Sequence, residues 1–543
     1  MRRVICTISS WKSPTRQAPS EPKASANSQR SPYHRPSWRL STMPPAFGWT
    51  LYRPRPNVSG PPLSRRKRGK RREQPSTLSF LSKGEHKLRS QMRLGLTVVA
   101  AAVQLVAHWP AGRLASLWQT LATQPTTVAE KNIRYLCIEI APAAVLGAAT
   151  AFNAAFALRL GASNAEIGLL SSIPALLAVV VMIPSGRIIG RRAQRMPLVV
   201  WSLFLNRLPY LLIALAPFIP GLPHGALVVA LLIASTPAGH FFGVGWNSML
   251  ADIIPEVRRA RVFAIRNIVN GVVVTAGIYV FGLWLDRIVF PINYQLMYGF
   301  GFAVALLSTY FVSKIDVPDS PVPFPQPQQA MTLQGLRTQT RDLVAQHRDF
   351  VQIIINTFLH GLGLWMIAPL YILYYVRQLG ASDGWIGLNG TLANLTPIIG
   401  FYLWQRGIGH WGENRVLKWT IILIGLYPIV VGLTPSLDTI LLLTAINGLI
   451  TPAVNLSHFP MLLKVCSDTH RPQFIGIYST IMNIGAFVMP LVGVYLADIF
   501  GFAPMIIAGG VLSVLGSCSF HVWALRTPDS LAARRLVTNP EQG

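Results

Sequence analysis

Long apolar stretches separated by short polar breaks run through most of the chain. From about residue 133 onward, twelve stretches of at least 18 residues follow one another. At about 1.5 Å rise per residue, each is long enough to cross about 30 Å of hydrocarbon as a helix. Lipid offers backbone groups no hydrogen-bond partner, so spanning segments must satisfy them internally, as helices do. The pattern predicts an all-α membrane protein with twelve transmembrane helices. The predicted spans are 133–158, 165–185, 196–219, 225–250, 262–285, 296–313, 350–376, 384–405, 415–434, 437–463, 473–497 and 502–525.

One break is longer than the others and divides the spans into two sets of six. It covers 314–349 and begins with closely spaced prolines, followed by leucines among Arg and Gln. That spacing suits a surface helix lying along the membrane. The chain is therefore expected to hold one six-helix bundle at 131–313, a cytoplasmic linker, and a second bundle at 350–526.

The residues outside the bundles are polar and basic. Residues 1–92 are rich in Ser, Pro and Arg and have too little apolar surface to fold, so we expect a disordered tail. Translation starting at Met92, a loosely membrane-associated tail and a targeting peptide all stay open. Within 93–130, Leu94–His108 is too short to span and is expected to be an interfacial helix. Residues 527–543 are predicted to be a cytoplasmic tail.

Composition supports a membrane location and argues against a nucleic-acid partner. Hydrophobic residues make up 51% of the chain and charged residues only 13%. The net charge of +28 is concentrated in residues 1–93, which hold 21 Lys/Arg against 3 Asp/Glu. The basic excess is thus mostly a property of the tail. The four cysteines are far apart and form no CxxC pair, so we expect no metal, and we expect no cofactor.

The charges in the short breaks predict how the chain is oriented. The breaks after spans 2, 4, 8 and 10 carry eleven Arg or Lys residues, whereas those after odd-numbered spans carry three. The tail, the linker and the C-terminal arginines fall on the eleven-charge side. The positive-inside rule then places both termini in the cytoplasm of a multi-pass protein of the cell membrane.

The two halves contain an internal repeat. Leu-Gly-Ala-Ser at 160–163, followed by Ile-Gly-Leu at 167–169, recurs at 379–382 and 386–388, an offset of 219 throughout. A looser match pairs the segments that begin at Arg259 and Arg471. The matches keep the same order and direction, so they predict two parallel six-helix repeats.

This plan resembles the major facilitator superfamily of secondary transporters, and two loops strengthen the resemblance. The loop after span two ends in Gly190 and the basic pair Arg191 and Arg192, as the family's signature loop does, although Arg187 stands where the family has an acidic residue. In the loop after span four, Asp252 ends one helix and Arg259 opens the next. The resemblance implies that such charges gate the cytoplasmic helix ends, and plain positive-inside topology is an equal alternative.

Few ionisable side chains lie inside the predicted spans, and each is a functional candidate because burying it costs about 2.5–3.5 kcal/mol. We take Glu139, Arg207, His240 and His360 as the candidates. The resemblance implies that spans 1, 4, 7 and 10 line a central cavity, which places three of the four there. Glu139 is a candidate proton-coupling carboxylate, with Arg207 as its charge partner or as a contact to an anionic substrate. The alternative is that the two form a structural ion pair. His240 is a proton relay or a packed histidine.

Asparagines on the same spans are candidate substrate contacts. They are Asn247, Asn356, Asn447 and Asn455. Their amides suit a polar solute at the bilayer midplane, and they equally suit hydrogen bonds between helices, worth about 0.6 kcal/mol each.

No enzyme or nucleotide-binding motif is present, so an enzyme and an ATP-driven pump within this chain are not expected. The leading hypothesis is a secondary active transporter of a small solute, working by alternating access and coupled to protons. The alternative is a membrane-embedded lipid-handling protein or enzyme on a transporter-like scaffold. The expected partners are a small-molecule substrate, protons and the lipid bilayer. We expect a monomer.

Overall fold

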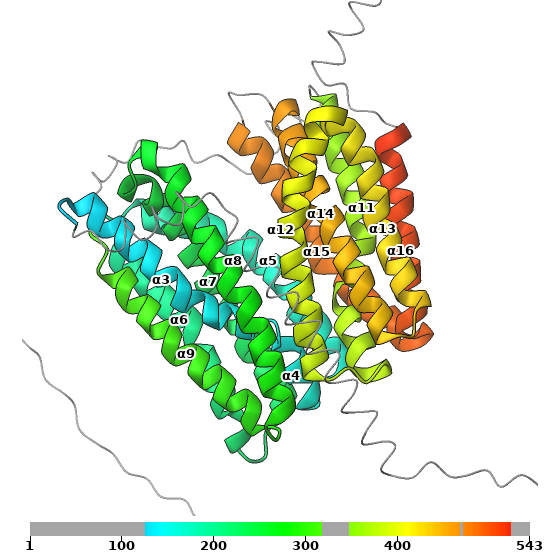
Figure 1. Ribbon diagram of the computed structural model, residues 1–543, viewed down its shortest axis with the longest axis horizontal. Coiled ribbons are helices and arrows are strands. Elements are labelled where there is room, and N and C mark those ends of the chain that lie inside the picture. The colour runs from blue at the N-terminus through cyan, green and yellow to red at the C-terminus, as the bar shows by residue number, and fades with distance from the viewer. Residues whose placement is uncertain (1–124, 318–346, 467–470, 523–543) are drawn as a thin grey trace, which may run out of the picture. The chain divides into compact units, whose positions relative to one another are not determined.

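The computed structural model describes residues 125–317, 347–466 and 471–522, which contain helices and no strands. The N-terminal half consists of α3 (Val128–Thr150), α4 (Asn153–Arg159), α5 (Asn164–Gly190), α6 (Met196–Leu215), α7 (His224–Ile253), α8 (Glu256–Arg287) and α9 (Ile292–Ser313). The C-terminal half consists of α11 (Arg348–Leu373), α12 (Asp383–Trp411), α13 (Glu413–Leu433), α14 (Leu437–Val465), α15 (Arg471–Phe500) and α16 (Phe502–Val522) (Figure 1). The predicted tails, the interfacial helix and most of the linker lie outside the described residues.

The predicted all-α membrane fold with two sets of six spans is confirmed. Eleven segments of the described chain are long and apolar enough to cross a membrane, and α3 and α4 together form the first of them. The twelfth long helix, α12, has 29 residues, but Asn389, Asn394 and several glycines interrupt its apolar sequence. Several helices extend beyond the apolar runs that predicted them, because polar residues at their ends continue the helix outside the hydrocarbon.

The buried apolar side chains form one shared cluster and two separate ones. The shared cluster joins residues of both halves, such as Phe156 and Tyr294 with Leu370 and Trp385. A second cluster, around Leu136 and Met249, belongs to the N-terminal half alone. A third, around Phe350 and Phe474, belongs to the C-terminal half alone. The two halves therefore share a core at the end of the spans that carries the Leu-Gly-Ala-Ser repeats.

The repeated Leu-Gly-Ala-Ser motif ends one helix and starts the next in both halves. Its glycines, Gly161 and Gly380, have φ of 89° and 64°, a left-handed conformation that glycine adopts without a Cβ penalty and that commonly ends helices. Its serines are N-caps: the Ser163 hydroxyl accepts from the backbone N–H of Glu166, and the Ser382 hydroxyl from that of Trp385. In both halves, the glycine of this motif thus ends one helix and the serine begins the next.

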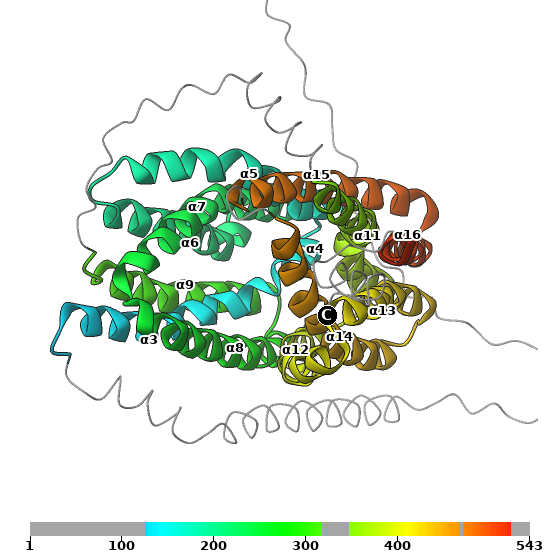
Figure 2. The ribbon, with the colours of Figure 1, turned by 90° about the horizontal axis from the view of Figure 1, so that it is seen from above.

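The second repeated glycine lies where helices of opposite halves cross. Figure 2 shows α5 beside α15 and α8 beside α12. A Cβ added at Gly387 of α12 would lie 2.8 Å from the Cα of Gly282 and 3.0 Å from the carbonyl oxygen of Ile278, both on α8. A Cβ added at Gly168 of α5 would meet side chains rather than backbone of α15, Val494 at 3.2 Å and Leu491 at 3.7 Å. The α8–α12 crossing is therefore a backbone-to-backbone contact, whereas the α5–α15 crossing has room to adjust.

This difference predicts unequal effects of the same substitution at the two repeated positions. Gly387→Ala is expected to destabilise the protein by about 1–3 kcal/mol, because backbone atoms of α8 must move. Gly168→Ala is expected to cost less than 1 kcal/mol, since a valine side chain can shift. Thermal unfolding of the two purified variants in detergent checks this. Equal midpoints would contradict the close approach.

Candidate functional site

The hydrogen bonds that join the two halves gather at the end carrying the Leu-Gly-Ala-Ser repeats. Their centre is Asp383, the first residue of α12, which is 5% exposed. Its carboxylate accepts from the guanidinium of Arg159, at the end of α4, at 2.8 Å, and from the hydroxyl of Tyr294, on α9, at 2.7 Å. A buried carboxylate on one half is thus held by a cation and a hydroxyl from the other.

Further contacts at this end are reciprocal between the halves. Arg159 donates to the carbonyl oxygen of Ala381, at 3.2 Å, and Arg377 donates to that of Ala162, the equivalent alanine of the other repeat. The ends of α8 and α15 contribute in the same way: Asp286 of α8 accepts from Ser382, and Asp498 of α15 accepts from Asn164. The repeats therefore hold the two halves together with approximate two-fold symmetry.

A separate charged cluster lies inside the N-terminal half. Glu139 on α3 forms an ion pair with Arg266 on α8, with an N–O distance of 2.6 Å. Ser308 on α9 donates to Glu139, at 2.8 Å, and accepts from Arg207 on α6, at 2.9 Å. The predicted partners Glu139 and Arg207 are thus linked through a hydroxyl, and the direct partner of the carboxylate is Arg266. These three charged residues are at most 8% exposed.

This cluster holds more positive than negative charge. It contains two guanidinium groups and one carboxylate. Arg207 also donates to the carbonyl oxygen of Ala305 and to Thr309, and Arg266 donates to the carbonyl oxygen of Leu136 and lies 5.4 Å from the ring of Trp246. Backbone carbonyls and an aromatic face thus stabilise the excess cation. All members belong to one half, so the cluster ties α3, α6, α8 and α9 together.

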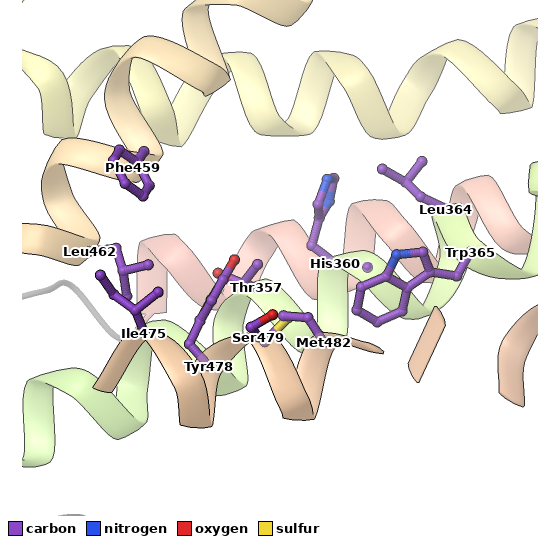
Figure 3. Close-up of a pocket in the computed structure, with 11 residues that line it drawn as sticks. Thr357, His360, Leu364, Trp365, Phe459, Leu462, Ile475, Tyr478, Ser479 and Met482 are labelled. Atoms are coloured by element: carbon purple, nitrogen blue, oxygen red, sulfur yellow. The ribbon is translucent and has the colours of Figure 1, made fainter. Parts of the chain in front are cut away.

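The C-terminal half contains a pocket of about 450 Å³ between α11, α14 and α15. In Figure 3, His360 and Trp365 of α11 lie beside Tyr478 and Ser479 of α15, and Phe459 comes from α14. Among the described residues that line it, none is Asp, Glu, Lys or Arg. The pocket is therefore lined mainly by aromatic and aliphatic side chains, with a few polar groups and no formal charge.

The remaining predicted candidates do not gather in one place. His240 on α7 is half-buried and contacts the carbonyl oxygen of Pro174 on α5, at 3.2 Å, which fits a packed histidine. Asn356 is buried on α11, Asn447 is half-buried on α14 with its side-chain oxygen enclosed, and Asn247 and Asn455 are exposed.

The predicted gating charges lie at the opposite end from the repeats. Arg187, Arg191 and Arg192 are exposed at the end of α5. Asp252 lies 3.5 Å from Arg195, which precedes α6, and Arg259 donates to the carbonyl oxygen of Ile254. These two contacts stay within the N-terminal half, so in this conformation they join neighbouring helices of one bundle.

A sequence profile of the Major Facilitator Superfamily matches residues 136–348 and 353–539. The chain belongs to this superfamily. It is thus a multi-pass membrane transporter rather than an enzyme, as the span pattern and the loops predicted.

Known superfamily members resemble the chain over most of its length. A putative sugar efflux transporter of Deinococcus radiodurans is 24% identical over 395 residues, which covers 71% of this chain and 96% of that protein. Among solved structures, a mutant of the nucleoside transporter NupG matches with a TM-score of 0.55 at 14% identity, covering 72% of this chain and 99% of that one. A D-xylose–proton symporter matches with a TM-score of 0.51 at 14% identity, covering 74% and 97%. At these identities the solved structures establish the shared fold.

For this superfamily member, sequence reasoning missed Arg266 and Asp383. Arg266 follows a run of loop arginines at the start of a predicted span, so it read as a continuation of the loop. Asp383 lies one residue before a predicted span. Both residues lie near the N-terminal end of a long helix, close to where its apolar sequence begins. A charged residue at such a position is the sequence signal that could have identified them.

Proposed function

We propose that the protein transports a neutral, hydroxyl-rich solute of the sugar or nucleoside class by alternating access, coupled to protons. The observation that carries the proposal is the uncharged pocket between α11, α14 and α15. Small-molecule sites typically combine aromatic walls with a few convergent polar groups. Trp365, Phe459 and Tyr478 offer faces for the C–H side of a sugar or for a base. Ser479 offers a hydroxyl, whereas the Thr357 hydroxyl already lies 2.7 Å from Nε2 of His458.

The hydrogen bonds of His360 give it a defined role in this pocket. Its Nδ1 lies 3.3 Å from the carbonyl oxygen of Ser513 and 3.0 Å from the hydroxyl of the same residue; because the carbonyl only accepts, we assign the proton to Nδ1. The hydroxyl of Ser517, 2.9 Å away, donates to the same carbonyl and can accept from this nitrogen. In a neutral ring, Nε2 then remains an acceptor, suited to a solute hydroxyl.

The known relatives support the same solute class. They are a putative sugar efflux transporter, a nucleoside transporter and a D-xylose–proton symporter. The last of these also supports proton coupling. With Asp383, Glu139 is one of two buried carboxylates in the described chain, and it is the one inside a bundle. We propose it as the coupling group.

Alternating access requires contacts between the halves that form at one face of the membrane and break when the other face closes. The contacts around Asp383 are suited to closing one face of the membrane in this way. If both termini are cytoplasmic, as the loop charges predict, these contacts close the outer face of the cell membrane in this conformation, and the solute reaches the pocket from inside.

Counterflow in proteoliposomes tests the solute class. Vesicles holding the purified protein are loaded with one solute and given the same solute, labelled, outside. We expect exchange with a pentose, a hexose or a nucleoside, and none with an amino acid or an organic acid. Exchange confined to charged solutes would overturn the assignment, because the pocket offers them no opposite charge.

The pocket predicts a specific effect of His360→Ala. We expect the apparent affinity for the exchanged solute to fall by about 10- to 100-fold, the loss of a hydrogen bond in a buried site. His240→Ala is the matched control, since His240 contacts α5 and does not line the pocket. Counterflow measured over a range of solute concentrations checks both. Equal losses would contradict the placement of the solute.

A further inference from the structure

A second pocket, of about 810 Å³, lies at the basic end of the C-terminal half, where α12 and α14 end and α13 begins. Arg415, Lys418, Lys464 and His521 line it. The one carboxylate among the described lining residues is Glu413, which pairs with Lys464 at 3.0 Å. Arg415, Lys418 and Lys464 carry three formal positive charges, against one negative charge on Glu413. This positive excess favours an anionic ligand.

The first turn of α13 adds backbone donors to the same wall. Gly412, Glu413, Asn414 and Arg415 all line the pocket, and Gly412 provides no side-chain cap for the helix. The first N–H groups of a helix have no partner within it and, with the helix dipole, favour an anion. The basic side chains and the N-terminus of α13 therefore line the same pocket and both favour an anion there.

The aromatic residues of the pocket point to a ligand from the membrane. Trp411 and Trp419 are 58% and 64% exposed, although tryptophan is a large apolar residue. Exposed tryptophans at the ends of spanning helices are typical of the membrane–water interface, where lipid headgroups lie. The Trp419 ring also contacts His521, with 5.6 Å between ring centroids. The pocket therefore combines basic side chains with two exposed tryptophans of the kind found at the membrane–water interface.

We propose that this pocket binds the headgroup of an anionic phospholipid. The phosphate lies against Arg415, Lys418 and the first turn of α13, and the acyl chains run past Trp411 and Trp419 into the bilayer. Soluble phosphate has the same anionic chemistry, but it would gain nothing from exposed Trp411 and Trp419. Their place beside the charges therefore favours the lipid as the source.

Thermal unfolding of the full chain in a neutral detergent tests this proposal. Phosphatidylglycerol, phosphatidylcholine or inorganic phosphate is added over a range of concentrations. We expect phosphatidylglycerol to raise the midpoint in a saturable way, and the other two to leave it unchanged. In the double variant Arg415→Gln and Lys418→Gln, we expect the concentration needed for half the effect to rise about tenfold or more.

A matched control is Arg406→Gln with Lys314→Gln, which removes two cations that lie over tyrosine rings and do not line the pocket. This control should respond to phosphatidylglycerol as the unmodified protein does. An equal loss in the control, an equal response to phosphatidylcholine, or stabilisation by inorganic phosphate alone would each overturn the proposal. None of these outcomes bears on the solute pocket.

Discussion

Asp383→Asn is expected to open the end of the molecule that carries the Leu-Gly-Ala-Ser repeats. The carboxylate is buried, pairs with Arg159 at 2.8 Å and accepts from Tyr294 at 2.7 Å, all across the boundary between the halves. Breaking a fully buried ion pair costs about 3–5 kcal/mol, and because the side chain of Arg159 is 28% exposed we expect about 2–3 kcal/mol. That shifts the balance between closed and open states by about 30- to 150-fold.

Spin-label distances across this end measure the shift. Leu222 and Leu433, which are 46% and 68% exposed, lie at this end in different halves and are replaced by cysteine after the native cysteines are removed. We expect the distance distribution to move to longer values in Asp383→Asn. Lys131→Gln, which breaks an exposed pair with Asp316 inside one half, should leave the distribution unchanged. An unchanged distribution in Asp383→Asn would show that other contacts close this end.

The spans could be predicted from sequence because their physical cause is local. An apolar run of sufficient length must become a helix in lipid, whatever the rest of the chain does. The same holds for the repeated motif: the positive φ of Gly161 and Gly380 and the N-caps Ser163 and Ser382 are local geometry. The repeat was therefore recognisable as a structural unit before its contacts were known.

The partners of the charged residues could not be predicted, since they depend on how helices face each other. Glu139 and Arg207 were expected to pair directly, but Ser308 lies between them and Arg266 takes the ion pair. Arg266 and Glu139 are far apart in the sequence, and no periodicity links them. The same limit applies to Asp383, whose importance follows from a cation on the opposite half.

Glu139→Gln is expected to cost about 3–5 kcal/mol of stability, the effect of leaving a buried cation without its partner. The cluster holds Glu139, Arg266 and Arg207 at no more than 8% exposure, so the variant would bury two cations and no anion. We expect the unfolding midpoint to fall by about 10 °C. A second substitution, Arg266→Gln, returns the formal charge of the cluster to its original value and should recover most of the loss.

This double variant separates the structural role of Glu139 from proton coupling. The single variant cannot do so, because a destabilised protein loses every activity. In the double variant, if Glu139 carries the coupling proton, accumulation driven by a proton gradient should be lost while counterflow of the same solute continues. If gradient-driven accumulation persists, coupling through Glu139 is wrong, and the carboxylate serves to neutralise Arg266 in a bundle that would otherwise hold two unbalanced cations.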